Sequence, residues 1–176
     1  MKNALLLQSW YSKITDNWYS WLKLELQKKG YKTNFIDIPE MRNDVPNMAK
    51  IIEFIKSFNV VDQDTTIVGH SLGCLLAMRL GEEFSFYKMI LVSGWDFDEL
   101  TEGHALFWKN KINHEKIKNH VKKIYVVHSD TDPYITACTA KDMSKRLGAK
   151  FILVNKGGHL TSKDGFIKLP QLIKII

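Results

Sequence analysis

The stretch TTIVGHSLGCLLAMRL, residues 65–80, decides the fold of this chain. It joins a short apolar run to an apolar helical pattern through Gly-His-Ser-Leu-Gly. This order predicts a buried strand, a sharp turn at Ser71 and a helix over residues 72–82. A G-x-S-x-G match alone arises by chance in roughly one chain in twenty of this size, so the rest of the sequence must give the turn its meaning.

Apolar runs and helical patterns alternate on both sides of this stretch. Further strands are predicted over residues 4–9, 32–38, 88–94, 123–129 and 150–155. Helical patterns cover residues 17–30, 44–58 and 134–148, with a less regular segment over 95–121 and a short last helix near Pro170. Strands that alternate with helices build a parallel sheet covered on both faces. We therefore expect one domain, residues 1–176, of the α/β class: a three-layer sandwich with a six-stranded parallel sheet.

The charge of the chain argues against a role in reading nucleic acids. The formal net charge is +6, yet only Arg42, Arg79 and Arg146 are arginines among 25 basic residues. Arginine is the favoured side chain for clamping phosphates and reading bases, so we expect no nucleic-acid partner. The densest basic segment, residues 109–123, is either a solvated lysine face or a patch that attracts acidic substrates or a membrane surface.

No membrane or export signal is evident in the sequence. No apolar run is long enough to cross a bilayer, and the first ten residues lack the apolar core of a secretory signal. The two cysteines, Cys74 and Cys138, have no C-x-x-C spacing, so we expect reduced thiols. We therefore expect a cytoplasmic protein without a stable membrane anchor, and neither a metal nor a cofactor. No particular protein partner is predicted.

Polar side chains follow three of the predicted strands at the point where each strand ends. Ser71 follows one, Asp130 and Asp132 follow another, and His159 follows the last. The carboxyl ends of parallel strands open on the same edge of a sheet, where ligands bind. Serine, acid and histidine in this chain order are the nucleophile, orienting acid and general base of α/β-hydrolases. The sequence thus predicts acyl transfer at Ser71, with His159 as the base.

Two aspartates in SDTDPY compete for the role of the acid. Asp132 precedes Pro133 and a helix, which places it at the loop tip that can reach His159, and we favour it. Asp130 is better suited to bind nearby main-chain amides in the turn.

The anionic intermediate of acyl transfer needs two hydrogen-bond donors. One is expected to be the amide of Leu72, the residue after the nucleophile. The second comes from the loop after the first strand, where we nominate Trp10, with Ser9 as a neighbour that can share the role. Trp10 as a bulky core residue is the alternative interpretation.

These motifs resemble the small serine hydrolases related to retinoblastoma-binding protein 9. GHSLG, SDTDPYI and GGHL carry the resemblance, which covers nearly the whole chain. It implies a reduced α/β-hydrolase fold without a large lid domain, and the triad Ser71, Asp132 and His159. The chain departs from many α/β-hydrolases in having Gln8-Ser9 where His-Gly is common. The L-x-C-x-E motif behind retinoblastoma-protein binding lacks its acid at residues 72–76, so the resemblance does not extend to that binding.

The function expected is hydrolysis of small carboxylic esters, thioesters or amides through an acyl-enzyme. A non-catalytic protein- or ligand-binding module on the same fold is the alternative. The aromatic segment 95–108 is either an acyl pocket, with Trp95 and Phe97 as walls, or the core of a small helical flap. The connection is too short for a separate lid, so we expect a shallow pocket that prefers acetyl to butyryl esters.

Overall fold

The computed structural model describes residues 2–97 and 110–176. In this part of the chain, six parallel strands form one sheet in the order β2-β1-β3-β4-β5-β6. The strands are β1 (Asn3–Leu7), β2 (Lys32–Asn34), β3 (Thr65–His70), β4 (Phe86–Val92), β5 (Val121–Ser129) and β6 (Lys150–Val154). The α-helices are α1 (Tyr19–Lys28), α2 (Met48–Ser57), α3 (Leu72–Glu83), α4 (His114–His120) and α5 (Ala137–Arg146). The predicted α/β class and six-stranded parallel sheet are confirmed.

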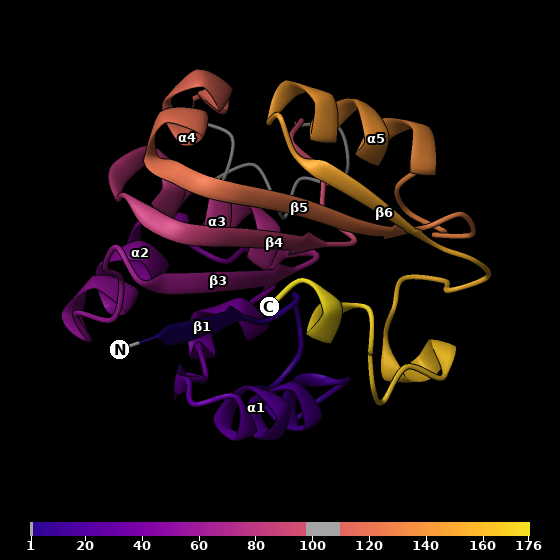
Figure 1. Ribbon diagram of the computed structural model, residues 1–176, viewed down its shortest axis with the longest axis horizontal. Helices are drawn as coiled ribbons and strands as arrows, with labels where there is room; N and C mark the ends of the chain where they lie inside the picture. The colour runs from indigo at the N-terminus through magenta and orange to yellow at the C-terminus, as the bar shows by residue number, and fades with distance from the viewer. Residues whose placement is uncertain (1, 98–109) are drawn as a thin grey trace.

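Alternate residues of each central strand enter two separate cores. In β1, Leu5 and Leu7 pack into one core, and Ala4 and Leu6 pack into the other. The first core is closed by α2, α3, α4 and α5, and the second by α1 and the C-terminal segment (Figure 1). Successive side chains of a strand point to opposite faces, so a segment buried on both faces must be apolar throughout, as residues 4–7 of this strand are.

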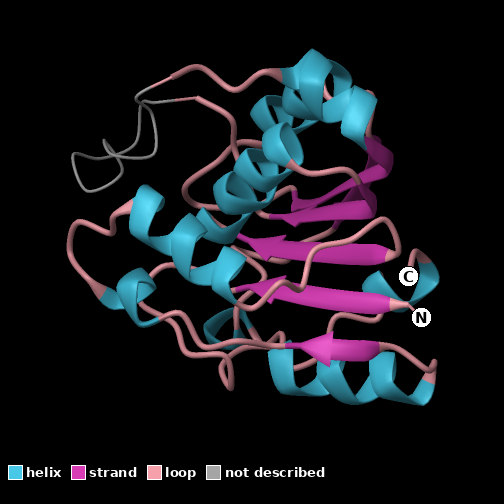
Figure 2. Ribbon diagram, turned by 90° about the vertical axis from the view of Figure 1, so that its left-hand side faces the viewer, coloured by secondary structure: helices cyan, strands magenta, loops and turns pink. Residues whose placement is uncertain are grey.

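The central position of β3 and α3 fixes where the predicted nucleophile lies. β3 pairs with β1 on one side and with β4 on the other. Ten consecutive residues of α3, from Leu72 to Gly81, are buried, which explains why this helix is apolar on most sides. The arrows in Figure 2 show the strands running the same way, so the loop at Ser71 shares an edge with the loops after the other strands.

Beyond shifts of one to three residues at the ends of other elements, three predicted segments differ from the observed ones. β2 ends at Asn34 rather than at residue 38, because the amide of Ile38 leaves the sheet and donates to Oε1 of the buried Gln8 at 3.2 Å. α2 begins after Asn47, whose side chain caps it, rather than at residue 44, and the last helix is a 3₁₀ turn, η4 (Leu172–Lys174). Two further 3₁₀ turns are η1 (Pro39–Arg42) and η3 (Ser162–Asp164).

The helices in the described part of the chain are short. None of its helices is both long and apolar enough to span a bilayer.

Candidate active site

The turn between β3 and α3 holds Ser71 in a strained conformation. Its backbone lies at φ 53° and ψ −119°, a region that residues other than glycine rarely occupy. Such a conformation costs about 1–3 kcal/mol and persists only where the surroundings enforce it. The Ser71 amide donates to the carbonyl of Val92 at 2.9 Å, and its carbonyl accepts from the amide of Cys74 at 2.9 Å. The hydroxyl is thereby held at the carboxyl edge of the sheet, beside the amino end of a buried helix.

The two glycines around Ser71 permit close packing for two different reasons. A Cβ atom at Gly69 would lie 2.5 Å from the carbonyl oxygen of Gly73, so the two sides of the turn crowd each other as expected. A Cβ atom at Gly73 would lie only 2.1 Å from the carbonyl oxygen of Leu7 in β1. Gly73 therefore lets α3 approach the neighbouring strand, a reason that the sequence pattern did not reveal.

The structure brings the side chains of Ser71, His159 and Asp132 into one chain of hydrogen bonds. His159 Nδ1 lies 2.8 Å from Asp132 Oδ2, and its Nε2 lies 2.9 Å from Ser71 Oγ. Because a carboxylate only accepts, Nδ1 carries the proton of the neutral imidazole, and Nε2 offers its lone pair to the hydroxyl. The arrangement can therefore move the Ser71 proton to His159.

Asp132 is a buried carboxylate held in its charged form. Its Oδ1 accepts from the amides of Tyr134 and Ile135, at 2.9 and 3.1 Å. Burial opposes the charge, but the hydrogen bond from His159 and the two amides outweigh burial and lower the pKa of Asp132. The buried His128, whose pKa is lowered by burial, lies 3.8 Å from the same carboxylate. Asp132 can thus orient the His159 ring and balance its positive charge.

Asp130, the other candidate acid, binds the main chain instead of the imidazole. Its Oδ1 accepts from the amide of Lys156 at 2.6 Å. The hydroxyl oxygen of Ser129 accepts a hydrogen bond from the amide of Gly157 at 2.8 Å. The end of β5 therefore fastens the loop that carries His159, and Asp130 binds an amide of that loop rather than one of its own turn as expected.

The candidate donors for the anionic intermediate lie on both sides of the nucleophile. Leu72 is the first residue of α3, and the first amides of a helix have no acceptor within the helix. The amide of Ser9 already donates to Oη of Tyr19 at 3.0 Å, which leaves Trp10 as the better candidate in the loop after β1. Trp10 is half-buried, and its indole Nε1 donates to the carbonyl of Asn43 at 2.9 Å.

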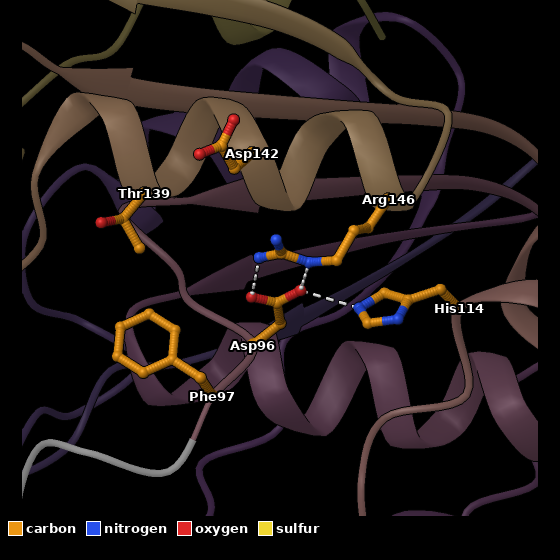
Figure 3. A pocket seen from close by; sticks show the side chains of 6 residues that line it. All are labelled: Asp96, Phe97, His114, Thr139, Asp142 and Arg146. Atoms are coloured by element: carbon orange, nitrogen blue, oxygen red, sulfur yellow. Dashed lines mark hydrogen bonds and ion pairs between the residues drawn. The ribbon is translucent and has the colours of Figure 1, made fainter.

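The two aromatic residues expected as pocket walls occupy different environments. Trp95 is 3% exposed and packs within the core, so it offers little surface to an open pocket. Phe97 lines a cavity of about 410 Å³ with residues of α4 and α5 (Figure 3). Ser71 and its two partners are not among the described residues that line this cavity. The other aromatic and apolar residues of the expected pocket or flap, Leu100, Phe107 and Trp108, lie outside the described residues.

A second cluster of charged side chains lies in this cavity. Asp96 accepts from Nε and one terminal nitrogen of Arg146, at 2.8 and 2.6 Å, and its Oδ2 lies 2.7 Å from His114 Nε2 (Figure 3). The Asp96 side chain is 1% exposed. The cluster ties the end of β4 to α4 and α5. No group of three or more metal-ligating side chains was found among the described residues.

Tyr134 is a contact of the site that the sequence reasoning missed. Its ring meets the His159 ring edge-on, with centroids 4.9 Å apart and an interplanar angle of 81°. Tyr134 is 68% exposed, so it flanks the site from the solvent side. Its place two residues after Asp132, on the same loop, is the signal that could have identified it.

Comparison with known proteins gives the class to which this fold and site belong. A profile of the serine hydrolase family matches residues 4–176, and the chain belongs to that family. This confirms the resemblance inferred from GHSLG, SDTDPYI and GGHL.

Individual relatives show how closely the chain follows known members. YdeN of Bacillus subtilis is 25% identical to this protein, over 99% of this chain and 94% of YdeN. The crystal structure of YdeN superposes on this one with a TM-score of 0.89, over 99% of this chain and 96% of that one. The serine hydrolase RBBP9 of Rattus norvegicus is 27% identical over 91% of this chain and 86% of its own. A carboxylesterase structure from Nitrososphaera gargenis shares the fold at 12% identity, with a TM-score of 0.71, over 99% of this chain and 88% of that one.

Proposed function

We propose that this protein is a serine esterase that hydrolyses small carboxylic esters through an acyl-enzyme on Ser71. The observation that carries the proposal is the hydrogen-bond chain from Asp132 through His159 to Ser71, with bonds of 2.8 and 2.9 Å. A binding module would need no serine, base and acid in register. The carboxylesterase among the proteins of similar fold agrees with an ester as the substrate class.

The first half of the proposed reaction acylates Ser71. His159 Nε2 takes the hydroxyl proton while Oγ attacks the ester carbonyl carbon. The amides of Leu72 and Trp10 stabilise the oxyanion that forms. The oxyanion then collapses, the bond to the alkoxy oxygen breaks, and the imidazolium of His159 gives its proton to the departing alcohol.

The second half releases the acid. A water molecule gives its proton to His159 Nε2 while its oxygen attacks the acyl carbon. Collapse of this second intermediate breaks the bond to Oγ, and the proton returns from His159 to Ser71. Throughout, Asp132 stays ionised and stabilises the imidazolium, which agrees with its lowered pKa.

Hydrolysis of a p-nitrophenyl ester tests this proposal. We expect turnover of p-nitrophenyl acetate by the wild-type protein and none above background by Ser71→Ala with unchanged circular dichroism. If the folded wild-type protein neither turns over the ester nor reacts with a fluorophosphonate, the alternative of a non-catalytic binding module is favoured.

A series of acyl chain lengths tests the substrate size. Each methylene buried against apolar surface contributes about 0.8 kcal/mol, so kcat/KM should rise over the first few carbons and level off or fall by octanoyl. The series is run below the micelle-forming concentration of each ester. A steady rise through dodecanoyl would contradict a shallow pocket and indicate a long apolar groove.

A further inference from the structure

His70, the residue before the nucleophile, is a polar side chain at the centre of an apolar core. It is fully buried and lies on the same face of β3 as Val68, two residues earlier. Three rings surround the imidazole, those of Trp18, Tyr19 and His159, with centroids 5.4, 5.7 and 5.6 Å away. Polar groups in such a place need hydrogen-bond partners, and both ring nitrogens have one.

The two partners of His70 determine which nitrogen carries the proton. Nε2 lies 3.1 Å from the main-chain carbonyl of His159, and a carbonyl only accepts, so Nε2 is the protonated nitrogen. Nδ1 therefore accepts, and the hydroxyl of Tyr19 donates to it at 2.7 Å. Tyr19 has a single hydroxyl proton, for which Ser9 Oγ at 3.1 Å is the alternative acceptor. The shorter contact and the need of the unprotonated Nδ1 for a donor assign this proton to His70. Burial, with the nearby His159, lowers the pKa of His70 to about 3, which keeps the ring in this singly protonated form.

The chain of hydrogen bonds continues to the loop after β1. Oη of Tyr19 accepts from the amide of Ser9 at 3.0 Å. The bonds thus run in one direction: from Ser9 to Tyr19, from Tyr19 to His70, and from His70 to the carbonyl of His159. One end adjoins Trp10, the candidate oxyanion donor, and the other end carries the candidate base.

The main chain of His159 is held from a second side as well. Its amide donates to Oδ2 of Asp164 at 3.1 Å, and the same oxygen accepts from the amide and hydroxyl of Thr161 at 3.0 and 2.6 Å. His70 supplies the contact to the carbonyl of the same residue. Loss of this contact would leave the position of the His159 ring relative to the Ser71 hydroxyl less well fixed.

We propose that His70 and Tyr19 are positioning residues that align the base loop and the oxyanion loop around Ser71. This inference rests on the proposed esterase function. A displacement of about 1 Å in a catalytic group can cost on the order of 10²-fold in rate. A role limited to core packing would lower stability without a selective loss of kcat, so the two roles make different predictions.

Steady-state kinetics separate these roles. Tyr19→Phe should lower kcat about tenfold and leave KM within about twofold, because alignment affects the transition state more than substrate binding. His70→Leu should lower kcat about 100-fold, and His70→Gln, whose amide can still donate near the Nε2 position, should recover part of the loss. Tyr31→Phe is the matched control, since Tyr31 is a buried tyrosine of the same core. All variants are assayed well below their unfolding temperatures.

Nuclear magnetic resonance of protein labelled with ¹⁵N-histidine tests the bonds without catalysis. We expect His70 to give the signal of a neutral imidazole with its proton on Nε2 between pH 5 and 8, perturbed in Tyr19→Phe but not in Tyr31→Phe. The buried His128, whose Nε2 also faces a carbonyl, should give a similar signal, so the His70 signal is identified by its loss in His70→Gln. A proton on Nδ1, or a kcat of Tyr19→Phe equal to that of Tyr31→Phe in an active enzyme, would overturn the inference. An inactive wild-type protein with the expected imidazole signal would instead refute the esterase function and leave only a structural hydrogen-bond chain.

Discussion

Two buried carboxylates in this protein hold a histidine at nearly the same distance, yet their surroundings differ. Asp132 Oδ2 lies 2.8 Å from His159 Nδ1, and Asp96 Oδ2 lies 2.7 Å from His114 Nε2. The charge of Asp96 is also matched by two hydrogen bonds from Arg146, whereas Asp132 receives main-chain amides. His159 contacts a strained serine through its other ring nitrogen. A carboxylate–histidine pair therefore indicates catalysis only when a nucleophile completes it and no fixed cation already balances the acid.

The largest expected effect compares the two histidines. His159→Ala should lower kcat for p-nitrophenyl acetate by about 10⁴–10⁶-fold, because it removes the base that acts on Ser71. His114→Ala should change kcat by less than about threefold, since its contact is part of an ion-pair cluster. The double variant Ser71→Ala, His159→Ala should be little worse than either single variant, because the groups act as a unit. Losses that multiply in the double variant, or a large loss in His114→Ala, would count against the assignment.

The second comparison exchanges each acid for its amide. Asp132→Asn should lower kcat about 10⁴-fold, because an amide favours the wrong imidazole tautomer of His159. Asp96→Asn should instead leave kcat nearly unchanged and lower the free energy of unfolding by about 1–3 kcal/mol, since Arg146 loses its charged partner. Kinetics and urea unfolding of both variants give the two values.

Asp130→Asn is the control for the second comparison. This residue lies on the same loop as Asp132 but accepts from the amide of Lys156, so its loss should perturb the loop and cost far less in kcat. The opposite ranking of Asp130→Asn and Asp132→Asn would transfer the role of the acid to Asp130.

The smallest expected effect is the pH dependence that the buried His70, next to Ser71, gives to the free energy of unfolding. His70 has a pKa of about 3 in the folded protein and an ordinary value near 6.5 when unfolded. Between about pH 3 and 6.5 the unfolded chain binds a proton on His70 that the folded protein does not bind. His70 therefore does not lower the free energy of unfolding above about pH 6.5, and it lowers it increasingly as the pH falls below that value. The slope from this residue reaches about 1.4 kcal/mol per pH unit at most.

Urea unfolding between pH 7.5 and 5 measures this slope. The wild-type protein should lose more stability over this range than His70→Gln, which cannot take up the proton. The buried His128 has a pKa shifted in the same direction, so the variant keeps part of the slope. Equal slopes for the wild type and His70→Gln would mean that His70 is not the neutral buried group described here.

The parts of the site that the sequence could predict are those with local causes. One short segment contains Gly69, Ser71, the strand before them and the helix after them. His159 and Asp132 were predicted at the same edge of the sheet because each follows a parallel strand. The contact of His70 with Tyr19 joins residues 51 positions apart, and no local pattern signals it. The early end of β2 and the burial of Trp95 likewise depend on tertiary contacts, with Gln8 in the first case and with the core in the second.

The most direct test of the account is the site of covalent labelling by a fluorophosphonate, read by mass spectrometry of the intact protein and of its peptides. Only a serine activated by a base reacts readily with such a probe. We predict one adduct per chain, on the peptide that contains Ser71, absent in Ser71→Ala and formed far more slowly in His159→Ala and Asp132→Asn but at the wild-type rate in His114→Ala. An adduct on another residue, or labelling that persists in Ser71→Ala, would contradict the claim that Ser71 is the nucleophile.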